Sequence, residues 1–150
     1  MSAKPQVLIS GFADEGPLDK KAEAQLTMLA ALGMSYYSLR FVDAGQGVKN
    51  VMQLTRREIA RLCKLHREFG VRVSSIGSPI GKVKLLDVED GSTNAYIPFD
   101  KYLKKDVQRA VDLAGAFETR LIRGFSFYHP RGEDPWGYVD QAGERLYEIA

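Results

Sequence analysis

Short apolar runs alternate with longer amphipathic stretches along the chain. The runs are continuously apolar or rich in β-branched residues, which favours strands buried on both faces. They are predicted at Gln6–Ser10, Ser35–Phe41, Val71–Ile76 and Arg120–Phe127. Between them, apolar residues recur every three or four positions, which predicts helices that cover such strands. These helices are predicted at 17–33, 55–70, 99–116 and 134–150.

The helix boundaries carry recognisable signals. Pro17 suits the first helical position, because its missing N–H would have no helical partner. Thr55 and Glu58 have the spacing of a capping box, in which two side chains bind otherwise unpaired backbone N–H groups. Gly70 is a natural end for the same helix. Core-facing positions are predicted at Leu18, Ala22, Leu26, Leu29, Ala30, Ile59, Leu62, His66, Phe69, Val107, Ala110, Val111 and Val139.

The repeating order of strand and helix predicts an α/β fold with parallel strands and outer helices. The chain holds four such units, whereas a barrel of this kind closes with eight. The last predicted helix reaches Ala150 without a glycine, a proline or a basic last turn to end it. We therefore predict one domain over residues 1–150, a (β/α)4 half-barrel that lacks strands five to eight at its C-terminus.

Composition narrows the class of protein. Hydrophobic residues make up 45% of the chain and charged residues 27%, which is ordinary for a globular domain. No run of about 18 apolar residues is present, so we expect no membrane span. A net charge of +2 gives no basis for a nucleic-acid or membrane partner. Cys63 is the single cysteine and leaves no internal disulfide, which fits a cytoplasmic protein.

Polar side chains gather just after each predicted strand. They are Asp14 and Glu15, Arg40 and Asp43, Ser78 and Lys82, and Ser126, Tyr128 and His129. The carboxyl ends of parallel strands meet on one rim, where such folds place their chemistry. We therefore predict a ligand site on this rim, and ordinary polar loops are the alternative explanation.

Arg123 lies inside a predicted buried strand. An unpaired buried charge is costly, so its guanidinium needs an acid, an anionic ligand or an open cavity. One interpretation is an ion pair with Asp14, Glu15 or an acid outside this chain, and the other is a clamp on a substrate carboxylate or phosphate. Arg40 has the same two interpretations. Lys82 follows a sharp turn after the third strand, where its ammonium could meet an anionic group.

Few other residues offer catalytic chemistry. His129, in a rim loop, is the candidate acid–base catalyst, with a solvated loop histidine as the alternative. His66 lies on an apolar helix stripe and is predicted to be a core histidine, and Cys63 is predicted to pack in the core. The two histidines lack metal-ligand spacing, so no metal ligand is predicted in this chain. A basic helix face, predicted to be solvated, is formed by Arg57, Arg61 and Lys64.

The loops that follow the predicted strands carry distinctive motifs. They are Gly11–Glu15, Ser38–Arg40 with Lys49–Val51, Ser74–Lys82 and Ile122–Tyr128. Taken in this order, over nearly the whole chain, they resemble the sugar phosphate isomerase/epimerase family. The Ser-Pro-Ile-Gly-Lys and Arg-x-Phe-Ser-Phe-Tyr elements are the more specific ones. The family also includes endonuclease-IV-like enzymes, so the resemblance fixes a fold better than a substrate.

The resemblance implies a xylose-isomerase-like TIM barrel with a divalent metal (Mn, Mg or Zn). Its ligands would be carboxylates and a histidine on strands five to eight, outside residues 1–150. Two of those carboxylates would move a proton beside a carbonyl. In this chain, the matching positions would shape the sugar pocket and are Arg40, Ser78, Lys82, Arg123 and Tyr128.

The expected parent function is therefore metal-assisted proton transfer beside a carbonyl of a sugar or sugar-like substrate. Whether this chain alone is an enzyme is left open. One alternative is a noncatalytic half-barrel that binds a ligand or associates with a second copy through open strand edges. Another is an endonuclease-IV-like barrel that acts on DNA, which the nearly balanced charge disfavours. The expected partners are a sugar or sugar phosphate and a homo-oligomer in the cytoplasm.

Overall fold

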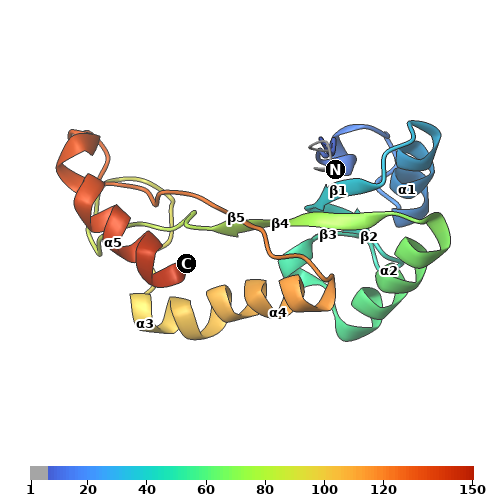
Figure 1. Ribbon diagram of the computed structural model, residues 1–150. Coiled ribbons are helices and arrows are strands. Elements are labelled where there is room, and N and C mark those ends of the chain that lie inside the picture. The colour runs from blue at the N-terminus through green and yellow to red at the C-terminus, as the bar shows by residue number, and fades with distance from the viewer. Residues whose placement is uncertain (1–6) are drawn as a thin grey trace, which may run out of the picture. The chain divides into compact units, whose positions relative to one another are not determined.

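The computed structural model describes residues 7–150 (Figure 1). Its strands are β1 (Tyr36–Leu39), β2 (Phe41–Asp43), β3 (Val48–Asn50), β4 (Arg72–Ile80) and β5 (Ile122–Gly124). Its α-helices are α1 (Ala22–Ala31), α2 (Arg56–Phe69), α3 (Phe99–Tyr102), α4 (Gln108–Ala116) and α5 (Val139–Ile149). Other helical segments are the π-helix Leu103–Val107 and the 3-10 helices Ala13–Glu15, Val51–Gln53 and Pro135–Tyr138. None of the described helices combines the length and hydrophobicity that crossing a bilayer requires.

The strands form two sheets. A three-stranded parallel sheet has the order β1-β4-β5, and β2 and β3 form an antiparallel hairpin. The predicted α/β class with parallel strands is thereby confirmed. The chain divides into two compact units. The first holds the described residues up to Ser78 together with Leu113–Ile122, and the second holds Pro79–Asp112 and Arg123–Ala150.

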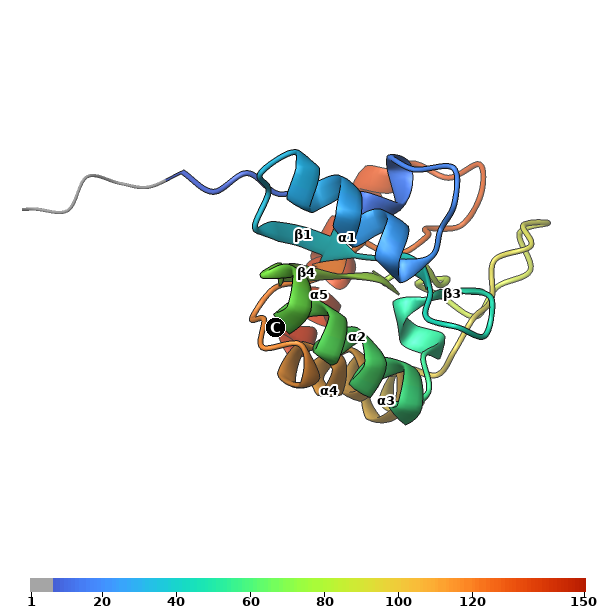
Figure 2. The same ribbon diagram turned by 90° about the vertical axis from the view of Figure 1, so that its right-hand side faces the viewer.

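The first unit is built on one hydrophobic core. Along β1, Tyr37 and Leu39 are buried, whereas Tyr36 and Ser38 are half-buried, which is the alternation expected of a strand. Other core residues are Leu26 and Leu29 of α1, Leu62 of α2, Val73 and Ile76 of β4, and Leu113 and Phe117 from the end of α4. α1 and α2 pack against each other, and Figure 2 shows them with β1 and β4.

α2 begins and ends as predicted. The Thr55 hydroxyl accepts a hydrogen bond from the Glu58 N–H at 3.3 Å, and the Glu58 carboxylate accepts one from the Thr55 N–H at 2.8 Å. Gly70 follows the helix with a φ of 65°, a left-handed conformation that suits glycine. Lys49 lies 2.8 Å from the buried Glu58 carboxylate. This contact, with the cap, lowers the pKa of Glu58 to about 2.

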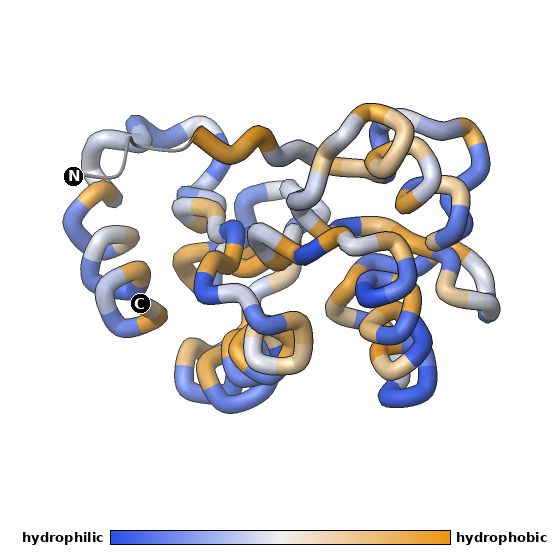
Figure 3. Tube along the Cα trace, turned by 45° about the vertical axis from the view of Figure 1, so that its right-hand side comes forward, coloured by the Kyte–Doolittle hydropathy of each residue, from blue (hydrophilic) through white to orange (hydrophobic). Residues whose placement is uncertain are grey.

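The predicted first strand is wrong for the described residues. Val7–Ile9 form no strand and are largely exposed. The segment pairs with β1 only at Phe12, which forms a parallel bridge with Ser38. Counting back in that register places Val7–Ile9 beyond Tyr36, where β1 begins and no strand remains to pair with them. They are the orange stretch at the start of the described chain in Figure 3, and Gln6 lies outside the described residues.

α1 begins at Ala22, five residues later than predicted. Pro17 does not start it, and Leu18 is fully exposed. The cause is a competing backbone contact, because the carbonyl of Lys20 accepts a hydrogen bond from the Asp43 N–H at 2.9 Å. Residues just before the helix therefore pair with the β2–β3 hairpin, which itself occupies a stretch predicted to be a loop.

β4 is longer than the predicted third strand. It continues to Ile80, because the Phe125 N–H donates to the Ile80 carbonyl at 2.8 Å. The turn therefore comes later, where the Lys82 N–H donates to the Pro79 carbonyl at 2.9 Å. The predicted fourth strand shortens to β5, only three residues long.

The second unit contains most of the helical span predicted at 99–116. The span is helical throughout but passes through the π-helix, and Val111 is exposed rather than core-facing. The segment between β4 and α3 is held by a buried ion pair between Lys84 Nζ and Asp90 Oδ1 at 2.9 Å. The Lys84 ammonium holds the pKa of Asp90 well below its usual range, so the Asp90 carboxylate stays charged.

Candidate functional site

The predicted site residues divide between the two units. The first unit holds Arg40 and Ser78, and the second holds Lys82, Arg123, Tyr128 and His129. In the first unit, Arg40 meets two carboxylates. In the second unit, Lys82 and Arg123 meet one aromatic ring.

Arg40, directly after β1, is held by ion pairs. Its Nε and Nη2 donate to Asp14 Oδ2 at 3.0 and 2.7 Å, and Nη2 also donates to Glu15 Oε1 at 2.7 Å. The guanidinium carbon lies 4.4 Å from the centre of the Phe12 ring and 5.6 Å from that of Phe41. Hydrogen bonding to Asp14, more than the contact with Glu15, raises the pKa of Arg40.

This cluster carries a net charge of −1, because two carboxylates surround one guanidinium. Sequence analysis named Asp14 and Glu15 as candidate partners of Arg123. In the structure both acids form ion pairs with Arg40. Asp14 is 94% buried (6% exposed), and its Oδ1 accepts no hydrogen bond within residues 7–150. Such an acceptor leaves about 1–3 kcal/mol of desolvation uncompensated. The cluster therefore suits hydroxyl or cationic groups better than a phosphate.

Gly77 allows β4 to pass close to Arg40. A Cβ at Gly77 would lie 2.6 Å from the Cβ of Arg40 and 2.9 Å from the carbonyl oxygen of Leu39. Real side chains do not approach so closely, so only glycine lets β4 pass this near to Arg40. Sequence analysis assigned Gly77 only to a turn and missed this role.

Serine hydroxyls accompany Arg40 on β1 and β4. Ser38 Oγ lies 2.6 Å from Ser75 Oγ, and Ser10 Oγ lies 2.5 Å from Ser74 Oγ. Ser38 and Arg40 are two positions apart, which places them on the same side of the extended chain. Hydroxyls both donate and accept, so this surface matches the hydrogen bonding of a polyol.

Ser78 does not lie in the turn where the sequence placed it. β4 extends through it, and its side chain has no exposed surface. The resemblance implied that Ser78 contacts a ligand directly. Its complete burial does not support such a contact. The error has the same cause as the misplaced turn, namely the pairing of β4 as far as Ile80.

Lys82 stands on a rigid turn in the second unit. Gly81 has a φ of 84°, and a Cβ there would lie 1.9 Å from the carbonyl oxygen of Phe125. The Gly81 N–H donates to the buried Tyr102 hydroxyl at 2.7 Å. The backbone before Lys82 is therefore fixed by contacts that no other residue at position 81 would allow.

Lys82 and Arg123 share the ring of Phe125. The Lys82 Nζ lies 4.6 Å from the ring centre, and the Arg123 guanidinium carbon lies 4.9 Å from it. The ring face partly offsets each charge and holds both cations against the same aromatic side chain. Ammonium and guanidinium groups are the side chains that commonly bind phosphate or carboxylate.

Tyr128 and His129 follow a strained residue. Phe127 has a φ of 67°, which costs a residue with a side chain about 1–2 kcal/mol, and its ring packs against Phe99. The Tyr128 N–H donates to the Val83 carbonyl at 2.9 Å, and its side chain is exposed. The His129 ring is 6.2 Å from that of Tyr138. The acid–base role of His129 stays a prediction.

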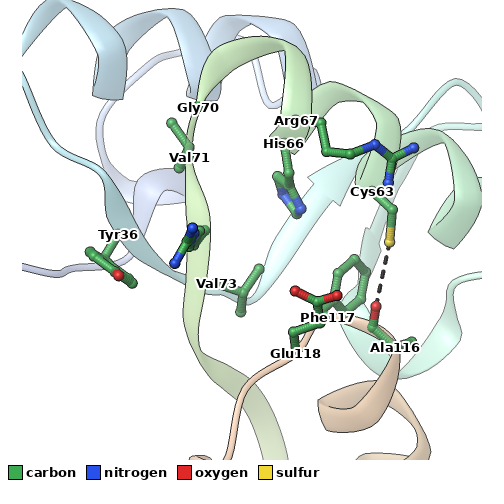
Figure 4. A pocket seen from close by; sticks show the side chains of 11 residues that line it. Tyr36, Cys63, His66, Arg67, Gly70, Val71, Val73, Ala116, Phe117 and Glu118 are labelled. Atoms are coloured by element: carbon green, nitrogen blue, oxygen red, sulfur yellow. Dashed lines mark hydrogen bonds between the residues drawn. The ribbon is translucent and has the colours of Figure 1, made fainter.

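A cavity of about 580 Å³ lies elsewhere in the first unit (Figure 4). Its lining includes Tyr36, Cys63, His66, Arg67, Arg72 and Glu118. Tyr36 and Arg72 are the first residues of β1 and β4, whereas Arg40 follows the last residue of β1. The cavity is therefore at the amino ends of these strands, away from the predicted rim.

The groups in this cavity are not activated for catalysis. His66 Nε2 lies 2.7 Å from the Tyr37 hydroxyl, and burial lowers the pKa of His66 to about 4. Burial raises the pKa of the Cys63 thiol, which donates to the Ala116 carbonyl at 3.5 Å. At neutral pH the imidazole is uncharged and the thiol protonated, so neither is a reactive nucleophile. The predictions of a core histidine and a packing cysteine agree with this.

The described residues include no group of three or more His, Cys, Asp or Glu side chains placed to hold a metal ion. The metal that the resemblance implies has no such group of ligands among these residues. Comparison with known proteins finds no family model and no curated protein that matches the sequence. The interactions that the candidate site residues make are hydrogen bonds, ion pairs and cation–π contacts.

Proposed function

We propose that this chain is a half-barrel of the sugar phosphate isomerase/epimerase type whose described residues bind the substrate. The parallel α/β architecture and the motifs after its strands support the proposal. The parent reaction is proton transfer beside a carbonyl of a sugar or sugar-like molecule, with metal ligands and proton-transfer carboxylates outside residues 1–150.

The observation that carries the proposal is the pair of cations at Phe125. Lys82 and Arg123 approach one ring within 5 Å, on a backbone that Gly81 and Tyr102 hold in place. A preformed cationic pair binds a phosphate or carboxylate without the cost of ordering two long side chains. We assign these residues to the anionic group of the substrate.

The first unit supplies a different kind of contact. Arg40 is neutralised by Asp14 and Glu15, so it serves to orient these carboxylates rather than to attract an anion. Glu15 is exposed, and the same unit carries serine hydroxyls on β1 and β4. Carboxylates and hydroxyls are the acceptors that sugar hydroxyl groups need.

Calorimetric titration tests the assignment of the anionic group. Inorganic phosphate and a hexose phosphate should bind, and the same hexose without phosphate should bind more weakly. Lys82→Ala should weaken phosphate binding by about tenfold, which is the loss of one charge-assisted contact. Lys101→Ala is the matched control, because this exposed lysine of the same unit lies on α3.

Two results would count against the proposal. One is equal affinity for the hexose with and without phosphate, and the other is an equal effect of Lys82→Ala and Lys101→Ala. Turnover of keto- and aldo-sugars with added Mn²⁺ gives a second readout. We expect none from this chain, because its described residues present no metal ligand set.

A further inference from the structure

An apolar stripe beginning just before α5 faces solvent. Trp136, Val139 and Tyr147 are 80%, 50% and 85% exposed. Val139, Gly143 and Tyr147 recur every four residues, which places them on one face of this helix (red in Figure 1). Trp136 lies just before it, in the 3-10 helix Pro135–Tyr138. A Cβ at Gly143 would meet no atom within 4 Å, so the described residues leave the middle of the stripe open. Exposed aromatic residues in a row mark a contact surface.

An adjoining side of α5 contacts its own unit. The Arg145 guanidinium carbon lies 5.1 Å from the ring centre of Phe99 and 5.7 Å from that of Phe127. Ala142 and Leu146 are half-buried on the same side. Val139 and Tyr147 stay exposed beside these contacts, so this part of α5 is accessible to another molecule.

A row of acids runs beside the stripe. Asp140, Glu144 and Glu148 repeat every four residues, so they form a ridge along α5. None of them makes an ion pair with any residue in the described part of the chain. An acidic ridge beside exposed aromatic rings selects a partner that offers Arg or Lys, which can pair with carboxylates and stack on the rings.

The exposed face of α2 offers those groups. Arg57, Lys64 and Arg67 lie on it, opposite the buried Leu62 and Glu58. Arg57 and Arg67 form no ion pair within residues 7–150, and Lys64 is only loosely paired, at 3.6 Å from a glutamate of its own helix. Of the basic face that sequence analysis noted, Arg61 pairs with Glu23 of α1. Arg57 and the neighbouring Arg67 therefore supply its uncompensated charge, with Lys64 weakly paired between them.

We propose that α5 of one copy docks on α2 of a second copy of this chain. The charged rows match in length, because Asp140 to Glu148 spans about 12 Å and Arg57 to Lys64 about 10 Å, at about 1.5 Å per residue. Carboxylates of α5 meet the cations of α2, and these cations stack on Trp136 and Tyr147. The contact joins different surfaces, so it is head-to-tail and leaves one α2 and one α5 free for further copies. This proposal does not depend on the function proposed above.

Sedimentation velocity and tryptophan fluorescence test the docking. Trp136 is the single tryptophan of the chain, so its emission reports this surface alone. As concentration rises, the average mass should increase, and the emission should shift to shorter wavelength because the indole leaves water. A constant monomer mass, or a rise in mass without a shift in emission, would overturn the proposal.

Charge reversal identifies the two surfaces. Glu144→Lys and Lys64→Glu should each weaken association by about tenfold, since like charges then face each other. Mixing the two variants should restore it, because the α5 of one and the α2 of the other are both unchanged. Glu89→Lys alters the net charge equally at an exposed residue outside the surface and is the matched control. Equal effects of Glu144→Lys and Glu89→Lys, or no recovery on mixing, would refute the head-to-tail contact.

Discussion

At the scale of single residues, Gly77 leaves no room for even one methyl group. The Cβ of an alanine there would lie 2.6 Å from the Cβ of Arg40, so either β4 or the backbone that carries Arg40 must shift. We expect Gly77→Ala to lower the free energy of unfolding by about 1–3 kcal/mol, as overpacking in a core does. Urea unfolding followed by circular dichroism measures it.

Gly115→Ala provides the comparison for Gly77→Ala. Gly115 lies in α4, and a Cβ there would meet nothing within 4 Å. Alanine favours helix over glycine by up to about 1 kcal/mol, so this variant should be neutral or more stable. If both variants destabilise the protein equally, the close approach of β4 to Arg40 is not what position 77 requires.

His66 gives the fold a defined sensitivity to acid. Its pKa is lowered by burial from 6.5 to about 4, so between these values the unfolded chain binds a proton that the folded chain resists. Stability therefore falls as pH drops through this window and levels off below it. At about 1.4 kcal/mol per pH unit, the loss approaches 3 kcal/mol. Urea unfolding from neutral pH down to about pH 4 measures it.

Two variants separate His66 from other titrating groups. His66→Gln removes the titration and can keep a hydrogen bond with the Tyr37 hydroxyl, so its stability should be flatter above about pH 4.5. His129→Gln should retain the full slope. Glu58 leaves the window above about pH 4.5 clear, because its stabilising contribution is lost only as pH falls from its usual pKa of 4.5 toward about 2. An unchanged slope in His66→Gln would contradict this assignment.

At the scale of elements, the start of α2 depends on one hydroxyl. Thr55 accepts from the Glu58 N–H and donates to its carboxylate at 2.8 Å. Thr55→Ala should therefore destabilise the protein by about 1 kcal/mol, the typical cost of a lost N-cap. Thermal unfolding measures it, with Thr27→Ala, at an exposed position within α1, as the control. Equal losses in both variants would mean that the cap contributes nothing.

α2 was predictable because its signals are local. Thr55 and Gly70 act within one turn of the helix ends. A strand such as β4 is likewise indicated by its own β-branched residues. The start of α1 was not, because the contact of Lys20 with Asp43 depends on a hairpin that the sequence pattern does not reveal. Val7–Ile9 have the composition of a buried strand, but pairing needs a neighbour that the register does not provide.

The sequence indicated which kinds of residue lie near the strand ends, but not which of them pair with each other. Polar residues after strands marked Arg40 and Lys82 correctly as charged groups near strand ends. Which acid meets which base depends on tertiary contacts, and the pairing of Asp14 with Arg40 is one of them. The stacking of Lys82 on Phe125 depends on the turn at Gly81, which is set by a backbone approach that no sequence pattern encodes.

At the scale of the whole molecule, the main hydrophobic core lies in the first unit, whereas α5 has no buried residue. Opening α5 exposes little apolar surface, so its amides should exchange with deuterium at least about tenfold faster than those of α2. If α5 docks on a second copy, this difference must shrink as concentration rises and return in high salt, which screens the charged rows. Hydrogen exchange at several concentrations therefore measures both the intrinsic stability of α5 and its partner. Slow exchange in α5 that does not vary with concentration would mean that its own unit holds the helix more firmly than its exposed aromatic residues indicate.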